Sequence, residues 1–284
     1  MKTAYFPSYT KVSETPVTIF EKLHPEVFDP PFFNDAVSMF RAKDSLRKEL
    51  DLTEETISEN RELLPLKGFV FHTSHCGSTL LANMFRTAKK TRVVSETEAI
   101  NGLLLSAIFY NLEEKILLKS LKIIVERYLQ PLDEAEQVVF KLTSWNVFFI
   151  ELFQKVFPEV PWIFIDRKTE EVVASLLKSG RGFVEWFYHP TNLLQNYFLG
   201  QEKQFESLEY YLFAMVEAHK KAAEKFRFGK NKFLEYPSFP NKFESEILPY
   251  FNLDYSEKEL ENAEEARKYD SKSIYKTPYS NLGS

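Results

Sequence analysis

A loop of small and polar residues between an apolar run and a helical pattern is the stretch of this sequence best suited to chemistry. The apolar run, Gly68 to Phe71, predicts a strand, and Leu80 to Phe85 predicts a helix. Gly77 permits a backbone conformation closed to other residues, so successive N–H groups can turn inward beside the unpaired donors of the first helical turn. These features predict an anion cradle, most naturally one for phosphate. Its residues are Ser74, His75, Cys76, Gly77, Ser78, Thr79 and Leu80.

The loop differs from the standard ATP-binding loop, because Gly-x-x-x-x-Gly-Lys-Ser/Thr is missing and no lysine precedes Ser78. The order His-Cys-Gly-Ser-Thr-Leu resembles the loop that binds the 5′-phosphosulfate in sulfotransferases that use 3′-phosphoadenylyl sulfate (PAPS). In that family a Lys or Arg stands where this chain has His75. The departure matters because a histidine is only sometimes charged near neutrality. Taken alone, the loop is also compatible with a glycine-containing turn that binds nothing.

A second part of the resemblance follows a later apolar run, Pro161 to Asp166, which predicts a strand. Arg167 comes directly after this strand, and Ser175 lies within the helix that follows. In the family, an Arg at the end of this strand and a Ser eight residues later hold the 3′-phosphate, and Arg167 with Ser175 matches both types and spacing. Arg suits a phosphate because its planar fork donates two parallel hydrogen bonds. The alternative is an exposed Arg167 paired with Glu170 or Glu171.

A third predicted strand runs from Gln137 to Thr143, and it is apolar up to its lysine, Lys141. Lysine is rarely buried, so Lys141 is either a side chain that snorkels to the sheet edge or a functional group. Sulfotransferases have Lys-Thr-His at this point, with the Lys near the transferred sulfuryl group and the His as base. The resemblance implies the first role for Lys141. Thr143 stands near the place of the histidine, so that base is absent.

Glu96 follows another short predicted strand, Arg92 to Ser95, at the sheet edge where open α/β folds bind ligands. Sulfotransferases of this broader type often carry a Glu here, and in the protein-tyrosine branch such a residue is the base. The resemblance therefore implies Glu96 as general base, with a histidine from the loop as the competing choice. Ser95 and Glu98 also have capping-box spacing, so these acids can instead start a helix. Both can hold, with Glu98 capping and Glu96 facing the site.

The segment from Tyr269 to Lys272 stands where sulfotransferases have a basic C-terminal segment that closes over the 3′-phosphate. The resemblance makes Lys272 a candidate for that contact. A solvated lysine with no ligand is the alternative.

The elements that must position these residues are five predicted strands alternating with helices, the last strand at Lys232 to Tyr236. This alternation predicts an α/β fold of P-loop type, with three layers and a central, mostly parallel sheet of about five strands flanked by helices. We expect residues 67–284 to form this domain and residues 1–66 to be an appendage that packs on it. The appendage is expected to be less regular, with a short helix after Phe32 and another from Thr53.

Composition narrows the class of protein. The 284 residues carry a formal charge of −5 and a sequence pI near 5.7, without a dense basic block, so we expect no nucleic-acid partner. The one cysteine excludes an intramolecular disulfide, and no signal-peptide or long apolar span is visible. We expect a soluble cytoplasmic protein with no membrane partner, and the oligomeric state stays open.

Together these patterns and the resemblance predict a PAPS-dependent sulfotransferase that moves a sulfuryl group to a hydroxyl or amine of a small acceptor. The loop would hold PAPS and its product 3′,5′-ADP, Lys141 and His75 would stabilise charge on the bridging oxygen, and Glu96 would deprotonate the acceptor. No metal is expected, since no His, Cys or carboxylate cluster has ligand spacing. Two alternatives remain: a catalytically silent module that binds 3′-phosphonucleotides, and a phosphotransferase in which Asp166 serves Mg²⁺.

Overall fold

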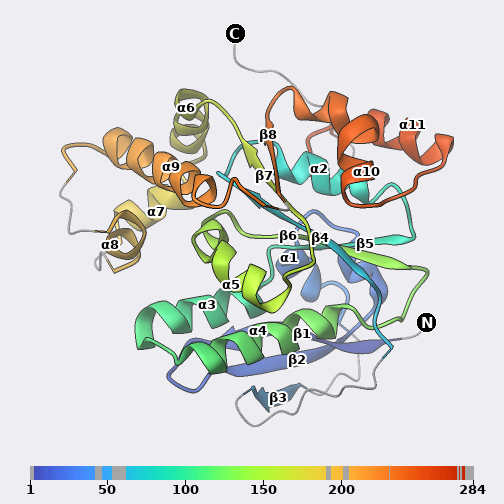
Figure 1. Ribbon diagram of the computed structural model, residues 1–284, viewed down its shortest axis with the longest axis horizontal. Helices are drawn as coiled ribbons and strands as arrows, with labels where there is room; N and C mark the ends of the chain where they lie inside the picture. Colours follow the sequence, from blue (N-terminus) through green and yellow to red (C-terminus); the bar gives the residue numbers. More distant parts are fainter. Residues whose placement is uncertain are drawn as a thin grey trace.

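The centre of the molecule is a five-stranded sheet in which every strand pairing is parallel, in the order β5-β6-β4-β7-β8 (Figure 1). The computed structural model describes residues 3–41, 47–52, 62–189, 193–200, 205–229, 231–273, 275 and 277–278. The prediction of an α/β fold with a parallel sheet flanked by helices is confirmed. The strands are β4 (Leu66–His72), β5 (Thr91–Ser95), β6 (Gln137–Lys141), β7 (Trp162–Asp166) and β8 (Asn231–Glu235).

Helices cover both faces of this sheet because side chains alternate along each strand. Phe69 and Phe71 of β4 belong to one hydrophobic cluster, and Val70 between them belongs to the other. The cluster with Val70 packs under α2 (Ser78–Phe85), α10 (Leu248–Tyr250) and α11 (Glu257–Ala266). The other packs under α3 (Glu98–Tyr110), α4 (Glu114–Tyr128), α5 (Ile150–Val156), α6 (Thr169–Ser179), α7 (Phe183–Phe187), α8 (Leu193–Leu199) and α9 (Leu208–Glu224).

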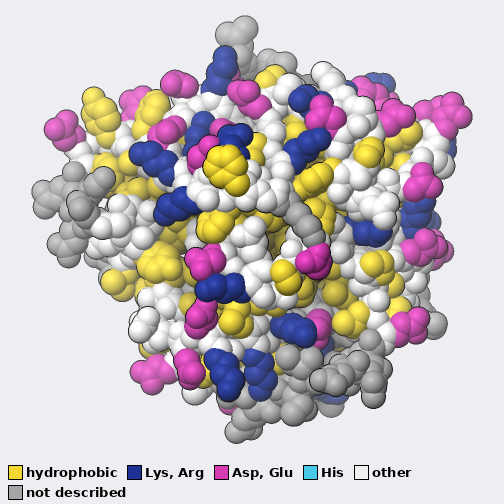
Figure 2. Space-filling view, in the orientation of Figure 1, with side chains coloured by type: hydrophobic (Ala, Val, Ile, Leu, Met, Phe, Trp, Pro, Cys, Tyr) yellow, Lys and Arg dark blue, Asp and Glu magenta, His cyan; other side chains and the backbone are white. Residues whose placement is uncertain are grey.

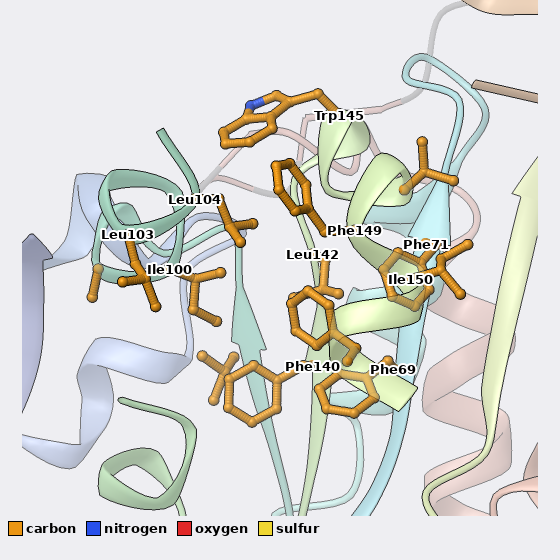
Figure 3. Packing of buried hydrophobic residues seen from close by; sticks show 14 of the residues in the cluster. Phe69, Phe71, Ile100, Leu103, Leu104, Phe140, Leu142, Trp145, Phe149 and Ile150 are labelled. Atoms are coloured by element: carbon orange, nitrogen blue, oxygen red, sulfur yellow. The ribbon is translucent and has the colours of Figure 1, made fainter. Parts of the chain in front are cut away.

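Figure 3 shows the larger cluster where Phe69 and Phe140 of the sheet meet Leu104 of α3 and Ile150 of α5. Trp145 lies at its upper edge, in the short helical segment η2 (Ser144–Phe149) that follows β6. The remaining short helical segments are η1 (Pro25–Phe28), η3 (Phe239–Lys242) and η4 (Phe243–Ile247). No helix in the described part of the chain combines the length and apolar character needed to cross a membrane.

The strand order creates a crevice at the carboxyl ends of β4 and β7. From β4 the chain continues to β5 at one edge of the sheet, and from β7 it continues to β8 at the opposite edge. Such a reversal is a topological switch point, the place where open parallel sheets bind ligands. The loop after β4 and Arg167 after β7 are therefore brought together by strand order alone.

The N-terminal part is more regular than the sequence indicated. It forms a second, antiparallel sheet of three strands, β1 (Ala4–Lys11), β2 (Val17–Leu23) and β3 (Lys48–Asp51). The helix α1 (Phe33–Val37) lies between β2 and β3 in the chain. Prolines are uncommon in strands, but Pro7 lies inside β1 at a register shift of the β1–β2 pairing, where a strand tolerates it. The short helix predicted after Phe32 is confirmed, and the helix predicted from Thr53 lies outside the described residues.

Gly102 allows the N-terminal sheet to approach the core closely. A Cβ added at this residue of α3 would lie 2.1 Å from the backbone oxygen of Thr10 in β1. Only a residue without a side chain lets the helix and the strand pack at this distance. This contact brings the N-terminal segment, including α1, toward the carboxyl ends of the central strands.

We expect Gly102→Ala to destabilise the protein. Replacing glycine by alanine inside a helix normally adds about 0.5–1 kcal/mol of stability, whereas overpacking a well-packed core costs about 1–3 kcal/mol. With a backbone atom as the clashing partner, the second effect should be larger. Urea unfolding of both proteins measures the difference, and a rise in the unfolding free energy would show that β1 does not pack on α3 this closely.

Candidate functional site

The loop after β4 has an unusual backbone. Ser74, His75 and Gly77 all have positive φ, at 78°, 48° and 81°. Positive φ is costly for residues other than glycine, and such residues concentrate at binding and catalytic sites. A Cβ at Gly77 would lie 2.6 Å from the Tyr236 ring, so glycine is needed both for its φ and for this approach. The loop turns sharply and presents the start of α2, which begins at Ser78.

A cavity of about 270 Å³ lies against this loop, and we call it the loop cavity. Of the residues predicted to bind the nucleotide, all except Ser74 line it: His75, Cys76, Gly77, Ser78, Thr79, Leu80, Arg167, Ser175 and Lys272. Tyr236 and Arg267, which the sequence interpretation missed, complete the wall together with Tyr269, Asp270 and Ser271 of the predicted closing segment. Tyr236 follows β8 directly, so its place at the end of a parallel strand was a usable signal.

The hydroxyl groups of Ser78 and Thr79 are available to a ligand. Each residue is 5% exposed, and neither hydroxyl has a hydrogen-bond partner among the residues that the structure describes. Cys76 differs, because it is fully buried and burial raises the pKa of its thiol. The thiol is therefore a packing group, and the two hydroxyls are the side-chain donors of the loop.

Arg167 and Ser175 come together at the loop cavity but are held by other groups. The Arg167 guanidinium donates through Nε to Glu171 (2.7 Å) and through Nη1 to the His75 carbonyl (3.3 Å), and it lies 5.1 Å from the centre of the Tyr236 ring. Ser175 Oγ is 2.6 Å from His75 Nδ1. The predicted alternative, pairing of Arg167 with Glu171, thus occurs within the same site that collects the ligand candidates.

His75 is not a cation in this site. Burial, followed by the charges of Lys272 and Arg167, lowers the pKa of His75 to about 4. The prediction that His75 stabilises negative charge as a histidinium is therefore not supported for the free protein. A neutral His75 still offers a hydrogen bond, which it now shares with Ser175.

Lys272 reaches the loop cavity through a short C-terminal segment. Asn83 of α2 donates to the Ser271 carbonyl at 2.8 Å, which fixes the segment across the helix. Burial lowers the pKa of Lys272, and the nearby Asp270 carboxylate acts in the opposite direction. Lys272 thus lines the cavity wall as a solvent-exposed residue, which agrees with both a ligand contact and the solvated alternative.

Lys141 and Glu96 form an ion pair at the ends of β6 and β5. The Lys141 ammonium contacts Glu96 Oε1 directly, and the lysine side chain is 2% exposed against 24% for the glutamate. Burial lowers the pKa of Lys141, whereas the carboxylate in contact with it favours the charged form. The lysine does not snorkel to solvent.

His72 lies on the inner side of this pair. Its Nε2 donates to the Leu142 carbonyl at 2.8 Å, and its Nδ1 accepts from the Ser74 N–H at 3.1 Å. Burial lowers the pKa of His72 well below its ordinary value, with Lys141 as the next cause. With both nitrogens used by backbone groups, this neutral imidazole supports the start of the loop and has no nitrogen left for an acceptor proton.

Glu96 lies in a strained turn before α3. Its φ is 53°, its N–H donates to the Lys141 carbonyl (2.9 Å), and its own carbonyl accepts from the Asn34 side chain (2.8 Å). The N-cap of α3 is Thr97 rather than the predicted Ser95, whose hydroxyl accepts instead from Arg86. The capping-box interpretation of Ser95 with Glu98 was wrong, since the turn places Glu96 between strand and helix and leaves it no capping role.

Glu96 lines a second cavity of about 430 Å³, whereas Lys141 is not among the residues that line either cavity. The wall of the second cavity combines acidic, amide and aromatic groups from five segments of the chain, α1 and its preceding residue among them. Thr143, which stands in the place of the family's histidine, lines it together with Glu96. The other lining residues are Phe32, Asn34, Asp35, Glu98, Asn101, Leu105, Trp145, Trp186 and Leu194.

Asp166 is occupied elsewhere. Its carboxylate lies 3.1 Å from Lys220 Nζ and accepts from the Arg167 N–H at 2.5 Å, and it is not among the residues that line the loop cavity. In the described ranges, no group of three His, Cys, Asp or Glu side chains is placed to hold a metal ion. On the face in Figure 2, basic and acidic side chains are interspersed rather than gathered into one basic surface.

Comparisons with known proteins assign no family to the chain. No protein-family model matches the chain, and no curated protein matches it. Among solved structures, the chain is similar to a sulfotransferase domain from the curacin biosynthetic pathway, at 11% identity and a TM-score of 0.36, over 72% of this chain and 78% of that one. A likeness this weak carries no functional argument, so the residues of the two cavities must carry it.

We expect His75→Gln to reduce the loss of unfolding free energy that occurs when the pH falls below 6.5. Because the folded protein lowers the pKa of His75 from 6.5 to about 4, the unfolded chain binds a proton there first, and stability present above pH 6.5 is lost as the pH falls toward 4. Since His75 is partly exposed, the loss attributable to it should be at most about 1 kcal/mol per pH unit.

Urea unfolding at pH 7.5, 6.5 and 5.5 measures this. The fall in unfolding free energy on acidification should be smaller in His75→Gln than in the parent protein. Parallel profiles for the two proteins would show that His75 is exposed and freely protonated.

Proposed function

We propose that this protein transfers a sulfuryl group from PAPS to a hydroxyl or amine of a small acceptor. The observation that carries the proposal is the loop cavity, where a strand–helix loop meets Arg167 and Ser175 beside the side chain of Lys272. The family resemblance assigned those residues to one nucleotide from sequence spacing alone. Their convergence at one switch point is what the proposal requires.

Each end of the nucleotide has matching groups. The backbone donors of the loop and the free hydroxyls of Ser78 and Thr79 suit the 5′-phosphosulfate at the start of α2. Arg167, Ser175 and Lys272 suit the 3′-phosphate, for which Arg offers two parallel donors. An arriving phosphate must compete with Glu171 for Arg167, so binding exchanges one ion pair for another.

The reaction centre in this proposal is the Lys141–Glu96 pair, of which Glu96 lines the second cavity. The acceptor oxygen or nitrogen would form a bond to sulfur while the bond from sulfur to the bridging phosphate oxygen breaks. Its proton would pass to Glu96, and Lys141 would stabilise the charge that develops on the departing 3′,5′-ADP. The phosphosulfate competes for Lys141, and this competition frees the Glu96 carboxylate to accept the proton.

The alternatives have less support. A phosphotransferase needs a loop lysine and a carboxylate for Mg²⁺, and Asp166 is paired with Lys220. A silent binding module would share the loop cavity but has no need of a buried, strained acid and base pair beside a second cavity. Turnover separates the silent module from the enzyme.

We expect 3′,5′-ADP to raise the melting temperature without added metal, and to do so far more than 5′-AMP. Only the first ligand carries the phosphate that meets Arg167 and Ser175. At one hundred times its dissociation constant, a ligand adds about 2.7 kcal/mol of stability. Thermal unfolding with each nucleotide is the experiment that tests the proposed function.

Two variants act as controls for this measurement. Arg167→Ala should remove the difference between the nucleotides, whereas Arg227→Ala, which removes an exposed arginine paired with Glu224, should keep it. Equal shifts from 3′,5′-ADP and 5′-AMP in the parent protein would rule out the nucleotide assignment.

We expect Glu96→Gln to lower turnover about 10²- to 10⁴-fold while 3′,5′-ADP binding stays intact, because the amide keeps the shape of the side chain but cannot accept the proton. His75→Gln should reduce turnover less, since the competing choice of a loop histidine as base is disfavoured by its bond to Ser175. Turnover assays and nucleotide titrations on both variants provide the comparison. Unchanged turnover in Glu96→Gln would transfer the role of base to another group.

A further inference from the structure

The second cavity has a one-sided charge. Three of its lining residues are acids, Asp35, Glu96 and Glu98, and no lysine, arginine or histidine appears among the described residues that line it. Lys141 balances only Glu96, which it contacts directly. Neither Asp35 nor Glu98 forms an ion pair with any described residue, so two negative charges at this wall lack a cation.

Glu98 is held in place without being neutralised. Its Oε1 accepts from the side chains of Asn34 (3.1 Å) and Asn101 (3.4 Å), both of which also line the cavity. Burial raises the pKa of Glu98, which means that removing its charge from water costs free energy that the two amides do not recover. A cation from outside the chain would recover it.

Aromatic rings on the same wall also favour a particular class of ligand. Trp145, Trp186 and Phe32 line the cavity, and the Lys141 ammonium already lies 5.2 Å from the centre of the Phe32 ring, which leaves the two indoles for a ligand. The Trp186 ring is stacked at 5.7 Å on Phe198, which fixes its orientation. Faces of indole and benzene rings attract organic cations and pack flat acceptor rings. The acids and the rings therefore favour the same kind of ligand from independent physical causes.

The acids do not form a metal site. Carboxylates that hold a metal ion converge on one point, and no such group of three occurs among the described residues. They flank a space of about 430 Å³ instead, which is large enough for an organic molecule.

We propose that the second cavity binds an acceptor that carries an organic cation, a protonated amine or guanidinium, on an aromatic or apolar frame with its nucleophile at Glu96. The inference rests on the proposed function for the role of Glu96. The cation would lie near Glu98 and Asp35 and stay unchanged during transfer. The nucleophile would give its proton to Glu96 and form the bond to sulfur, and the electron pair of the broken S–O bond would leave with 3′,5′-ADP.

Three phenols of matched shape test this without any nucleotide: tyramine is cationic, 4-ethylphenol neutral and 3-(4-hydroxyphenyl)propanoate anionic. Calorimetric titration should show tyramine binding at least about tenfold more tightly than 4-ethylphenol, and no binding of the propanoate. Glu98→Gln keeps the oxygen that accepts from Asn34 but loses the charge, so the preference for tyramine should fall to about twofold or less. Asp35→Asn, at an exposed position, should lower it by a smaller factor.

Glu113→Gln is the matched control, because it removes one acid from an exposed position before α4 and should leave the preference unchanged. Equal binding of the three phenols, binding of none, or a preference that survives Glu98→Gln would overturn the inference. The proposed function fails separately, through the nucleotide titration. Tyramine selectivity without a response to 3′,5′-ADP would retain a cation-binding cavity in a protein that is not a sulfotransferase.

Discussion

The site depends on one buried cation and the carboxylate that contacts it. Lys141 ends a central strand and is nearly inaccessible to water, a position that costs several kcal/mol for an unpaired charge. Glu96 meets it because Ser95 and Lys141 lie opposite each other in the β5–β6 pairing, so the next residue of β5 turns across the strand end. The sheet register therefore sets the pair, and Glu96 of this pair lines the second cavity.

The polar side chains of the site already pair with one another. Arg167 is held by Glu171, His75 by Ser175 and Lys141 by Glu96. Each pairing satisfies a polar group that is at least partly buried, and each must be exchanged when an anion enters. The donors of such a site are already in position, but each is paired with another protein group. An anionic ligand must replace these partners, so its binding free energy is less favourable than the number of donors suggests.

The sequence was sufficient for the parts of the site that follow directly from strands. The loop after β4 and the residues after β5, β6 and β7 were located because parallel strands end at one edge, where position along the chain becomes position in space. The cap of α3 was misplaced by two residues because Glu96 adopts positive φ, which no local pattern announced.

The antiparallel N-terminal sheet was missed since its prolines hid the alternation of β1. The wall of the second cavity joins α1, α3, η2, α7 and α8 through long-range packing. Neither feature has a local signature, and both depend on contacts between distant parts of the chain.

Asn34 links the N-terminal segment to the turn that carries Glu96. Its amide nitrogen donates to the Glu96 carbonyl, and its oxygen accepts from the Glu98 N–H at 3.0 Å, so one side chain from the N-terminal segment clamps the turn that carries the acid. Phe32 and Asp35, its near neighbours, line the second cavity but not the loop cavity. The described residues around α1 thus shape the second cavity and not the loop cavity, so substitutions there would alter the first while the wall of the other keeps its residues.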